Sequence, residues 1–383
     1  MLKPKSIITF KIVWIGSCIF LLFVSIGYSQ HYSSSFSWQH ELFLHETSSL
    51  AMSNAALTHF INPAVGGRKN HLQFRSNLGT ANPYSINFDA AGYNPELRNF
   101  GLSFTDHRFW FAFSAEDFNF TWFDQGTNRF QTFRLHAGYQ MNSTLSIGIG
   151  TGINRSSLPE VINHTNFGGQ PSQEQYSLSF DFGLYYATSF KTSRFIFQPE
   201  TGLSLNNIGN YHKYERDVWP KELYSPQAGQ LSWSSGLSAT TKDEWRGRSW
   251  VTAGVYAGLN KYFTRMPALN GDSGNGFRDL FTNWDSFELR DNPNEKVNAN
   301  DQISLGLGAK VTILEILSVQ YGRLSGADLW VRSRQSWGIG LEYSYFSVNM
   351  TGISYRSEAR WDDNSGLLFY EVTVNLPLSI INL

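Results

Sequence analysis

The sequence predicts an all-β fold: a transmembrane antiparallel β-barrel of about fourteen strands with a short helical plug before the first strand. Three observations predict it. Long segments alternate apolar and polar residues with a period of two, a lysine-flanked apolar segment has the layout of a secretory signal, and short turns alternate with long loops.

The first element is the signal. Lys3, Lys5 and Lys11 precede an apolar run over residues 12–26, and the small and polar residues 27–30 follow it. This order is typical of a cleaved secretory signal, so we expect residues 1–29 to be a signal peptide. An uncleaved anchor is the alternative, but the run is short for a spanning helix.

The next element is the plug. Residues 31–64 do not alternate and could form one or two short helices. Small side chains such as Ala51 let a helix pass close to the barrel wall, and Pro63 stops a helix because it lacks a backbone donor. We therefore expect residues 30–68 to be a plug segment and residues 69–383 to form the barrel.

The clearest strands form a predicted hairpin over residues 129–154. Period-two alternation gives each arm one apolar face and one polar or glycine face. Each arm runs about ten residues, the length that crosses a bilayer when tilted. We expect Ser146 to face the lumen and the alternating apolar residues to face lipid: Leu145, Ile147 and Ile149 here, and Ile303, Leu305 and Leu307 later in the chain.

Similar segments recur along the chain, with less certain boundaries before residue 124. An even number between about fourteen and sixteen is expected of a closed bacterial barrel, and we predict fourteen. The candidate strands are residues 71–79, 83–91, 99–104, 109–115, 118–123, 129–140, 145–154, 176–187, 194–207, 230–240, 250–259, 302–311, 317–321, 336–345, 347–355 and 367–376. Long connections lie at 155–175, 206–229, 260–301 and 356–366.

Composition agrees with such a barrel. Only 41% of the 383 residues are hydrophobic, while 16% are aromatic. One face of each strand contacts lipid, and aromatic girdles mark both interfaces. The net charge of -1 gives no reason to expect a nucleic-acid partner. Cys18 is the only cysteine and lies in the signal, so the mature chain is expected to have no disulfide or thiolate metal site.

Two segments carry a resemblance to a known family. The small-residue run Ser48–Ala56, followed by Phe60–Ala64, is similar to the N-terminal signature of FadL-like outer-membrane proteins. Within that family the chain most resembles the PorV/PorQ branch of Bacteroidota, and residues 255–261, 303–310 and 317–323 support that branch. The chain departs from the family pattern at residues 50–53 and 57–59. The motif residues are Ala51, Met52, Asn62, Pro63 and Ala64.

The resemblance implies an outer-membrane location, contact with outer-membrane lipids and two functions of different classes. PorV-like proteins serve the type IX secretion system, where protein partners are the translocon or secreted cargo with a C-terminal sorting domain. FadL-like proteins move hydrophobic small molecules through the barrel. A transporter should place its plug beside an apolar lumen pocket, whereas a cargo-binding barrel should expose apolar side chains on its extracellular loops.

The predicted loops do carry aromatic side chains, which are enriched at protein-binding surfaces. We take these as candidate partner-binding residues, and a function in secretion is therefore modestly favoured over a function in transport. The alternative is that the rings only fold the loops onto one another as a lid. The candidates are Trp219, Tyr224, Phe277, Phe281, Trp284 and Phe287.

Catalysis is not indicated by the sequence. The chain contains no nucleophile elbow, zinc-protease helix or phosphate-binding glycine loop, so we predict no enzyme, no catalytic residues and no cofactor. A Ser-His pair formed across strands is the alternative left open. His40, His45 and His59 lack the spacing of a metal site, and none is predicted.

Overall fold

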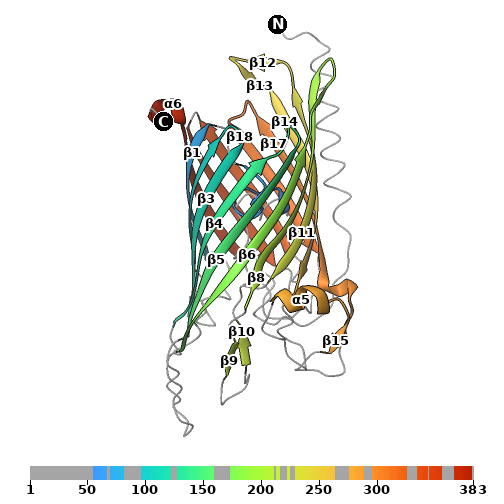
Figure 1. Ribbon diagram of the computed structural model, residues 1–383. Helices are drawn as coiled ribbons and strands as arrows, with labels where there is room; N and C mark the ends of the chain where they lie inside the picture. Colours follow the sequence, from blue (N-terminus) through green and yellow to red (C-terminus); the bar gives the residue numbers. More distant parts are fainter. Residues whose placement is uncertain are drawn as a thin grey trace. The chain divides into compact units, whose positions relative to one another are not determined.

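The structure is a computed structural model that describes residues 55–66, 70–81, 96–121, 127–158, 173–210, 213–215, 222–224, 229–263, 276–288, 296–325, 334–343, 345–355 and 366–381. Fourteen long antiparallel strands close into a barrel, which confirms the predicted fold class and strand number (Figure 1). They are β1 (His71–Ala81), β2 (Glu96–Asp106), β3 (Phe109–Thr121), β4 (Thr127–Gln140), β5 (Leu145–Leu158), β6 (Gln173–Ala187), β8 (Phe195–Gly209), β11 (Gln230–Thr241), β14 (Val251–Tyr262), β17 (Ile303–Ile313), β18 (Leu317–Ser325), β19 (Arg334–Tyr343), β20 (Phe346–Tyr355) and β21 (Gly366–Pro377).

The barrel closes between its first and last strands. β1 pairs with β21 over eleven residue pairs, from His71 opposite Pro377 to Ala81 opposite Leu367. The other neighbours follow chain order, with β8 paired to β11. Every long strand therefore has a partner on both sides, as a bilayer requires because it offers no water to unpaired backbone groups.

The predicted faces are confirmed where the structure describes them. Ile147 and Ile149 are exposed on the outer surface, Leu145 is partly exposed, and Ser146 is buried toward the lumen. On β17 the outward residues Ile303, Leu305 and Leu307 are likewise exposed. The outer face of the barrel is thus apolar and the inner face polar, the reverse of a soluble protein, because lipid surrounds the wall.

One expected pair of strands is a single strand. The sequence predicts separate strands over residues 109–115 and 118–123, but β3 runs without a break from Phe109 to Thr121. The acidic pair between them resembles a turn in sequence, yet Glu116 points inward to Arg134 and Asp117 bonds Arg129 on β4. Each carboxylate finds a cation on the neighbouring strand, so the alternation continues through them. The candidate strand 83–91 lies outside the described residues.

Short turns gather at one end of the barrel and long connections at the other (Figure 1). In transmembrane barrels the short turns face the periplasm and the long loops the exterior. The short-turn end carries β7 (Phe190–Lys191), the hairpin of β12 (Glu244–Trp245) and β13 (Arg248–Ser249), and α6 (Leu378–Ile381). The long-loop end carries β9 (Lys213–Glu215), β10 (Glu222–Tyr224), α5 (Gly276–Thr282), β15 (Phe287–Glu288), β16 (Lys296–Val297) and η3 (Asn300–Gln302).

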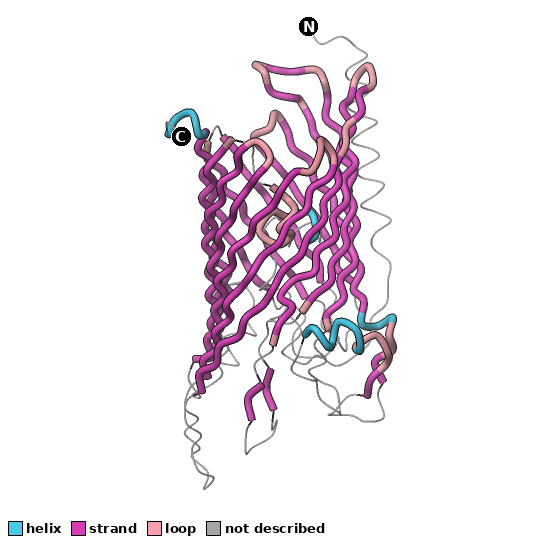
Figure 2. Tube along the Cα trace, viewed as in Figure 1, coloured by secondary structure: helices cyan, strands magenta, loops and turns pink. Residues whose placement is uncertain are grey.

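Residues 55–66 lie inside the ring of strands (Figure 2). Their only helix is one 3-10 turn, η1 (Ala55–Leu57), which packs against β8 and β11. Residues 30–54 of the expected plug segment lie outside the described residues. Across the described ranges, no helix is long and apolar enough to cross a membrane.

Candidate functional site: the plug seat and the charged band of the lumen

We call the part of the barrel wall that contacts residues 55–66 the plug seat, and Asn62 lies at its centre. It is fully buried, and its Nδ2 atom donates hydrogen bonds to the carbonyl oxygens of Ala56 at 2.7 Å, Leu184 at 3.1 Å and Leu203 at 3.4 Å. Its Oδ1 atom accepts from the backbone N–H of Ala64 at 2.9 Å. One side chain therefore shapes the turn, as asparagine commonly does, and ties it to β6 and β8.

Two further hydrogen bonds hold the plug to other strands. The indole Nε1 of Trp110, on β3, donates to the carbonyl oxygen of Pro63 at 2.9 Å. The backbone N–H of Ala56 donates to Ser234 Oγ, on β11, at 3.3 Å. These two bonds and the two bonds from Asn62 to the wall connect the plug to four of the fourteen strands, β3, β6, β8 and β11.

The barrel wall is glycine where the plug approaches it. A Cβ atom added to Gly148 would lie 2.0 Å from Pro63 O, and one added to Gly183 would lie 2.0 Å from Asn62 Oδ1. A Cβ on Gly202 would lie 2.0 Å from Ala56 O. Heavy atoms do not approach one another this closely, so glycine at these three positions of β5, β6 and β8 makes room for the plug.

The structure brings the predicted motif residues Asn62, Pro63 and Ala64 together in this seat. Ala51 and Met52 lie outside the described residues. A functional role for the motif stays a prediction, but its structural role in seating the plug follows from the contacts above.

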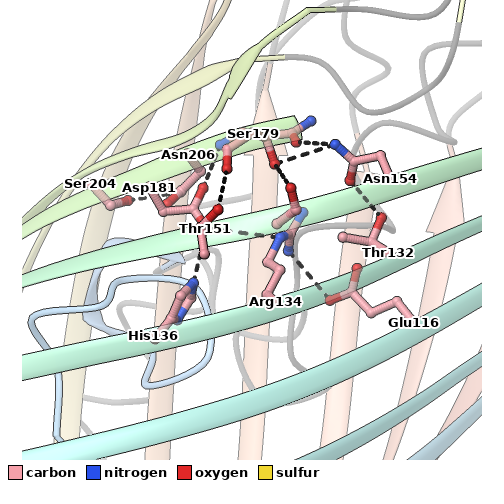
Figure 3. Close-up of polar contacts among 12 residues, drawn as sticks. Glu116, Thr132, Arg134, His136, Thr151, Asn154, Ser179, Asp181, Ser204 and Asn206 are labelled. Carbon is pink, nitrogen blue, oxygen red and sulfur yellow. Dashed lines mark hydrogen bonds and ion pairs between the residues drawn. The ribbon is translucent and has the colours of Figure 1, made fainter. Parts of the chain in front are cut away.

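Next to the plug lies a charged band made of Glu116, Arg134, His136 and Asp181 (Figure 3). His136 Nε2 lies 2.9 Å from Asp181 Oδ2, Arg134 Nη1 lies 3.5 Å from Glu116 Oε1, and Arg134 Nε lies 3.9 Å from Asp181 Oδ2. All four side chains are buried. Ionisable groups at this depth are costly unless paired, so the ion pairs explain how the band is tolerated.

The charged band spans β5 at a position where β5 has a glycine. His136 on β4 and Asp181 on β6 flank Gly150 in register, although β5 lies between their strands. A Cβ on Gly150 would lie 2.3 Å from the His136 ring, so only glycine lets the two side chains meet. Glycine on β5 therefore serves both the plug seat and the charged band.

Asp181 also fixes an irregularity in the wall. The pairing of β6 with β8 shifts register between Phe180 and Phe182, and Asn207 adopts a φ of 55° there. The Asp181 carboxylate accepts the N–H of Asn207 with Oδ1 and faces His136 with Oδ2. The carboxylate thus replaces a backbone partner at a bulge and couples the bulge to the charged band.

Some polar atoms of the charged band have no protein partner. Arg134 Nη2 and Glu116 Oε2 are buried without a hydrogen bond. Buried polar atoms are nearly always satisfied, so these two leave capacity for a water molecule or a polar group of a ligand. Within the described part of the chain, no group of three or more His, Cys, Asp or Glu side chains is arranged to hold a metal ion.

Beyond the charged band, toward the long-loop end, one sector of the lumen wall is apolar. Phe369, Leu97, Phe118 and Phe130 are inward-facing and buried, on β21, β2, β3 and β4. They are register partners in one row, with Gly79 of β1 between the first two. The rings of Phe118 and Phe130 stack with centroids 6.4 Å apart. We call these four side chains the apolar row.

The predicted partner-binding residues separate into different environments. Phe277, Phe281 and Trp284 are 45%, 78% and 46% exposed on or just after α5, whereas Phe287 is buried. Tyr224 lies in β10, and Trp219 lies outside the described residues. The Phe277 ring lies 6.0 Å from that of Phe180, an outward residue of β6, so α5 sits beside the outer wall.

The segment around α5 is firmly attached to the barrel. Asn283 Nδ2 donates to the Phe263 carbonyl at 2.7 Å, and Gln302 Nε2 donates to the Asp285 carbonyl at 2.6 Å. Lys261 Nζ donates to Gln302 Oε1 and lies 5.6 Å from the Trp284 ring centroid. Some rings do pack the loop, as the lid alternative expects, but Phe281 remains exposed.

Sequence reasoning missed the charged band and the apolar row. Arg134 and His136 alternate with Phe133 and Leu135 in a spanning strand, and ionisable residues there are a signal of function. Their partner Asp181 is more than forty positions away, and only the barrel register brings the two together. The apolar row was hidden because Phe118 and Phe130 follow the rhythm of strands whose outer faces are also aromatic.

No family model matches the chain, and no curated protein matches it. Among solved structures, it is similar to a FadL homologue from Pseudomonas aeruginosa, with 12% identity and a TM-score of 0.44, over 87% of this chain and 98% of that chain. It is also similar to the toluene transporter TbuX of Ralstonia pickettii, with 9% identity, a TM-score of 0.46 and the same coverage of 87% and 98%. The toluene transporter TodX of Pseudomonas putida shows 10% identity and a TM-score of 0.44, again over 87% and 98%.

Proposed function

We propose that this chain is an outer-membrane transporter for hydrophobic small molecules. The observation that carries the proposal is the apolar row, Phe369, Leu97, Phe118 and Phe130, whose buried side chains point inward on the long-loop side of the charged band. Lumen-facing positions of a water-filled channel are polar, so an inward apolar row calls for an explanation. Ligand sites are commonly apolar surfaces with a few polar groups nearby, and the charged band supplies such groups.

The plug supports the same proposal. Four hydrogen bonds and three glycine contacts fix residues 55–66 across the lumen, an arrangement that suits a gated path rather than an open pore. The similarity of Asn62–Pro63–Ala64 to the FadL-like signature agrees with this function.

The test uses two substitutions on one strand. Phe118 faces the lumen and Phe111, also on β3, is exposed on the outer face. Uptake of a radiolabelled aromatic hydrocarbon is measured in cells that produce equal amounts of folded barrel. We expect Phe118→Asn to lower uptake about tenfold, because a polar group in an apolar site weakens binding by roughly 1–3 kcal/mol, while Phe111→Asn leaves uptake near wild type. Equal uptake by the two variants contradicts the proposal.

A second function, as an accessory of type IX secretion, is supported by the exposed rings of Phe277, Phe281 and Trp284. Exposed aromatics on an anchored segment are suited to binding a protein, because little conformational freedom is lost. The test is a pull-down from outer membranes with wild-type protein and with Phe277→Ser/Phe281→Ser. Specific loss of secreted or translocon proteins from the variant, with hydrocarbon uptake unchanged, would favour secretion over transport. Recovery of the same proteins with both forms would contradict this second function.

A further inference from the structure

Basic side chains gather on one sector of the short-turn end. Two neighbouring turns supply them: the β7–β8 turn and the hairpin of β12 and β13 between β11 and β14. The backbone N–H of Lys242 donates to the carbonyl oxygen of Arg194 at 2.9 Å, so the two turns are in contact. We call this sector the basic rim; its cations are Lys191, Arg194, Lys242, Arg246 and Arg248.

The hairpin that carries two of these cations is a defined structure. Trp245 pairs with Arg248, and the two residues between them have positive φ values, 52° for Arg246 and 74° for Gly247. Two successive left-handed residues form the tight turn that suits the twist of a hairpin. The backbone N–H of Ser249 donates to Glu315 Oε1 at 3.0 Å, which ties the base of the hairpin to the β17–β18 turn.

The basic rim faces the lipid side of the wall. The Arg248 guanidinium lies 5.5 Å from the ring centroid of Tyr343, an exposed residue in the outward row of β19. Trp245 and Trp250 are both exposed, with ring centroids 6.5 Å apart, and the Arg246 guanidinium lies 4.7 Å from the Trp245 ring. Tryptophan, tyrosine and arginine in this arrangement are typical of a membrane–water interface.

The depth of the hairpin agrees with the headgroup layer. The apolar outer face of β14 begins at Val251, directly after Trp250. Trp245 pairs with Arg248, three residues before Val251. The hairpin therefore rises about 10 Å along the strand and about 8 Å along the membrane normal at a tilt near 40°. The polar layer on each side of a bilayer is roughly 5–8 Å thick. Arg246 and Arg248 therefore lie at the level of lipid phosphates.

Four of the five cations of the basic rim are available to a ligand. Lys191, Lys242 and Arg246 are exposed and Arg248 is half-buried. Within the described ranges, no carboxylate forms an ion pair with any of these four. Asp243 and Glu244 lie in the same hairpin, and the five cations still leave an excess of positive charge. The β4–β5 turn, residues 141–144, has no charged residue at all.

We propose that the basic rim binds an anionic phospholipid of the periplasmic leaflet. Arg246 and Arg248 contact the headgroup phosphate, which arginine holds with paired N–H donors. Trp245 and Trp250 pack on the glycerol and upper acyl region, where their rings meet the aromatic interface belt. Phosphatidylglycerol fits this site better than phosphatidylethanolamine, because its headgroup adds no cation beside the arginines. The inference concerns the outside of the barrel and does not depend on the function of the lumen.

The experiment is native mass spectrometry of the full-length folded barrel, titrated with phosphatidylglycerol or phosphatidylethanolamine. We expect the wild-type protein to prefer phosphatidylglycerol. Each arginine near an anionic lipid surface contributes about a fivefold effect, so Arg246→Gln/Arg248→Gln should reduce binding of phosphatidylglycerol on the order of 25-fold. The control is Arg108→Gln, an exposed cation in the β2–β3 turn whose backbone carbonyl accepts a hydrogen bond from the N–H of Gln140.

Two outcomes overturn the proposal. One is a wild-type protein that binds both lipids equally, which means the basic rim meets water or a protein instead. The other is a fivefold loss of phosphatidylglycerol binding in Arg108→Gln, the same loss per charge as in the double variant, which means that total charge decides the result. Heat-modifiable gel mobility establishes that each variant is folded. If the double variant does not fold, Lys242→Gln, at the base of the hairpin, replaces it with an expected fivefold loss.

Discussion

Adding one methyl group to Gly148 should unseat the plug without altering the lipid-facing surface. In Gly148→Ala the new Cβ would lie 2.0 Å from Pro63 O and 2.5 Å from Ala64 N. Carbon and oxygen need roughly 3.2 Å or more, so Pro63 must retreat by about 1 Å. That movement strains the 2.9 Å bond from Trp110 to Pro63.

The magnitude follows from those contacts. Overpacking costs about 1–3 kcal/mol, and loss of one hydrogen bond adds about 1 kcal/mol. Seating of the plug should therefore weaken by roughly 2–4 kcal/mol, which shifts the seated-to-displaced ratio by about 30- to 1,000-fold. The polar lumen would then fill with water.

Single-channel conductance in planar bilayers measures the effect, and we expect longer and larger openings in Gly148→Ala than in the wild type. Gly152→Ala is the control on the same strand and the same face. Its Cβ would meet the Ser179 hydroxyl at 2.7 Å, which can rotate away, and no atom of the plug. Conductance of Gly148→Ala that matches both the wild type and Gly152→Ala would refute the contact between Gly148 and the plug.

Ile147→Arg should lower the free energy of unfolding by roughly 2–4 kcal/mol and Ser146→Arg by far less, because Ile147 faces lipid; equal losses in a refolding assay would mean the faces are wrongly assigned. Burial lowers the pKa of the His59 imidazole, in the plug, to about 4 from an ordinary 6.5, so the seated plug favours neutral histidine. Seating of the plug should therefore be complete above pH 6.5 and weaken as the pH falls toward 4. Conductance should rise between pH 7 and pH 5 in the wild type but not in His59→Gln. N-terminal sequencing of outer-membrane protein should begin near Gln30, and a chain that begins at Met1 would contradict cleavage of the signal.

The sequence predicts the wall of this barrel well because each strand carries its own period-two signal. Ile147 and Ser146 point to opposite faces because successive side chains of any strand do so, and no contact with a distant strand is needed to predict it. The error at β3 is local as well. Glu116 and Asp117 resemble a turn until Arg134 and Arg129 are known to lie beside them.

The candidate site depends on register between distant strands, which the sequence does not display. Asn62 and Pro63 are recognisable as a turn and a stop, but Leu184 and Leu203 could not be identified as the partners of Asn62. The glycines of β5 are visible in sequence, and room for a plug is a fair interpretation of them. Which glycine meets Pro63 and which meets His136 follows only from the pairing of β4, β5 and β6.

The pairing of β1 with β21 also sets an order of assembly. The seam joins His71 to Pro377, and closing a loop of that length costs roughly 5 kcal/mol of chain entropy. Until β21 arrives, β1 and β20 are open edges that could pair with another chain. Residues 55–66 directly precede β1, so they can occupy the space that the wall encloses before the seam forms. A chain that lost β21 would expose two edges at once and would be a substrate for quality control rather than a smaller barrel.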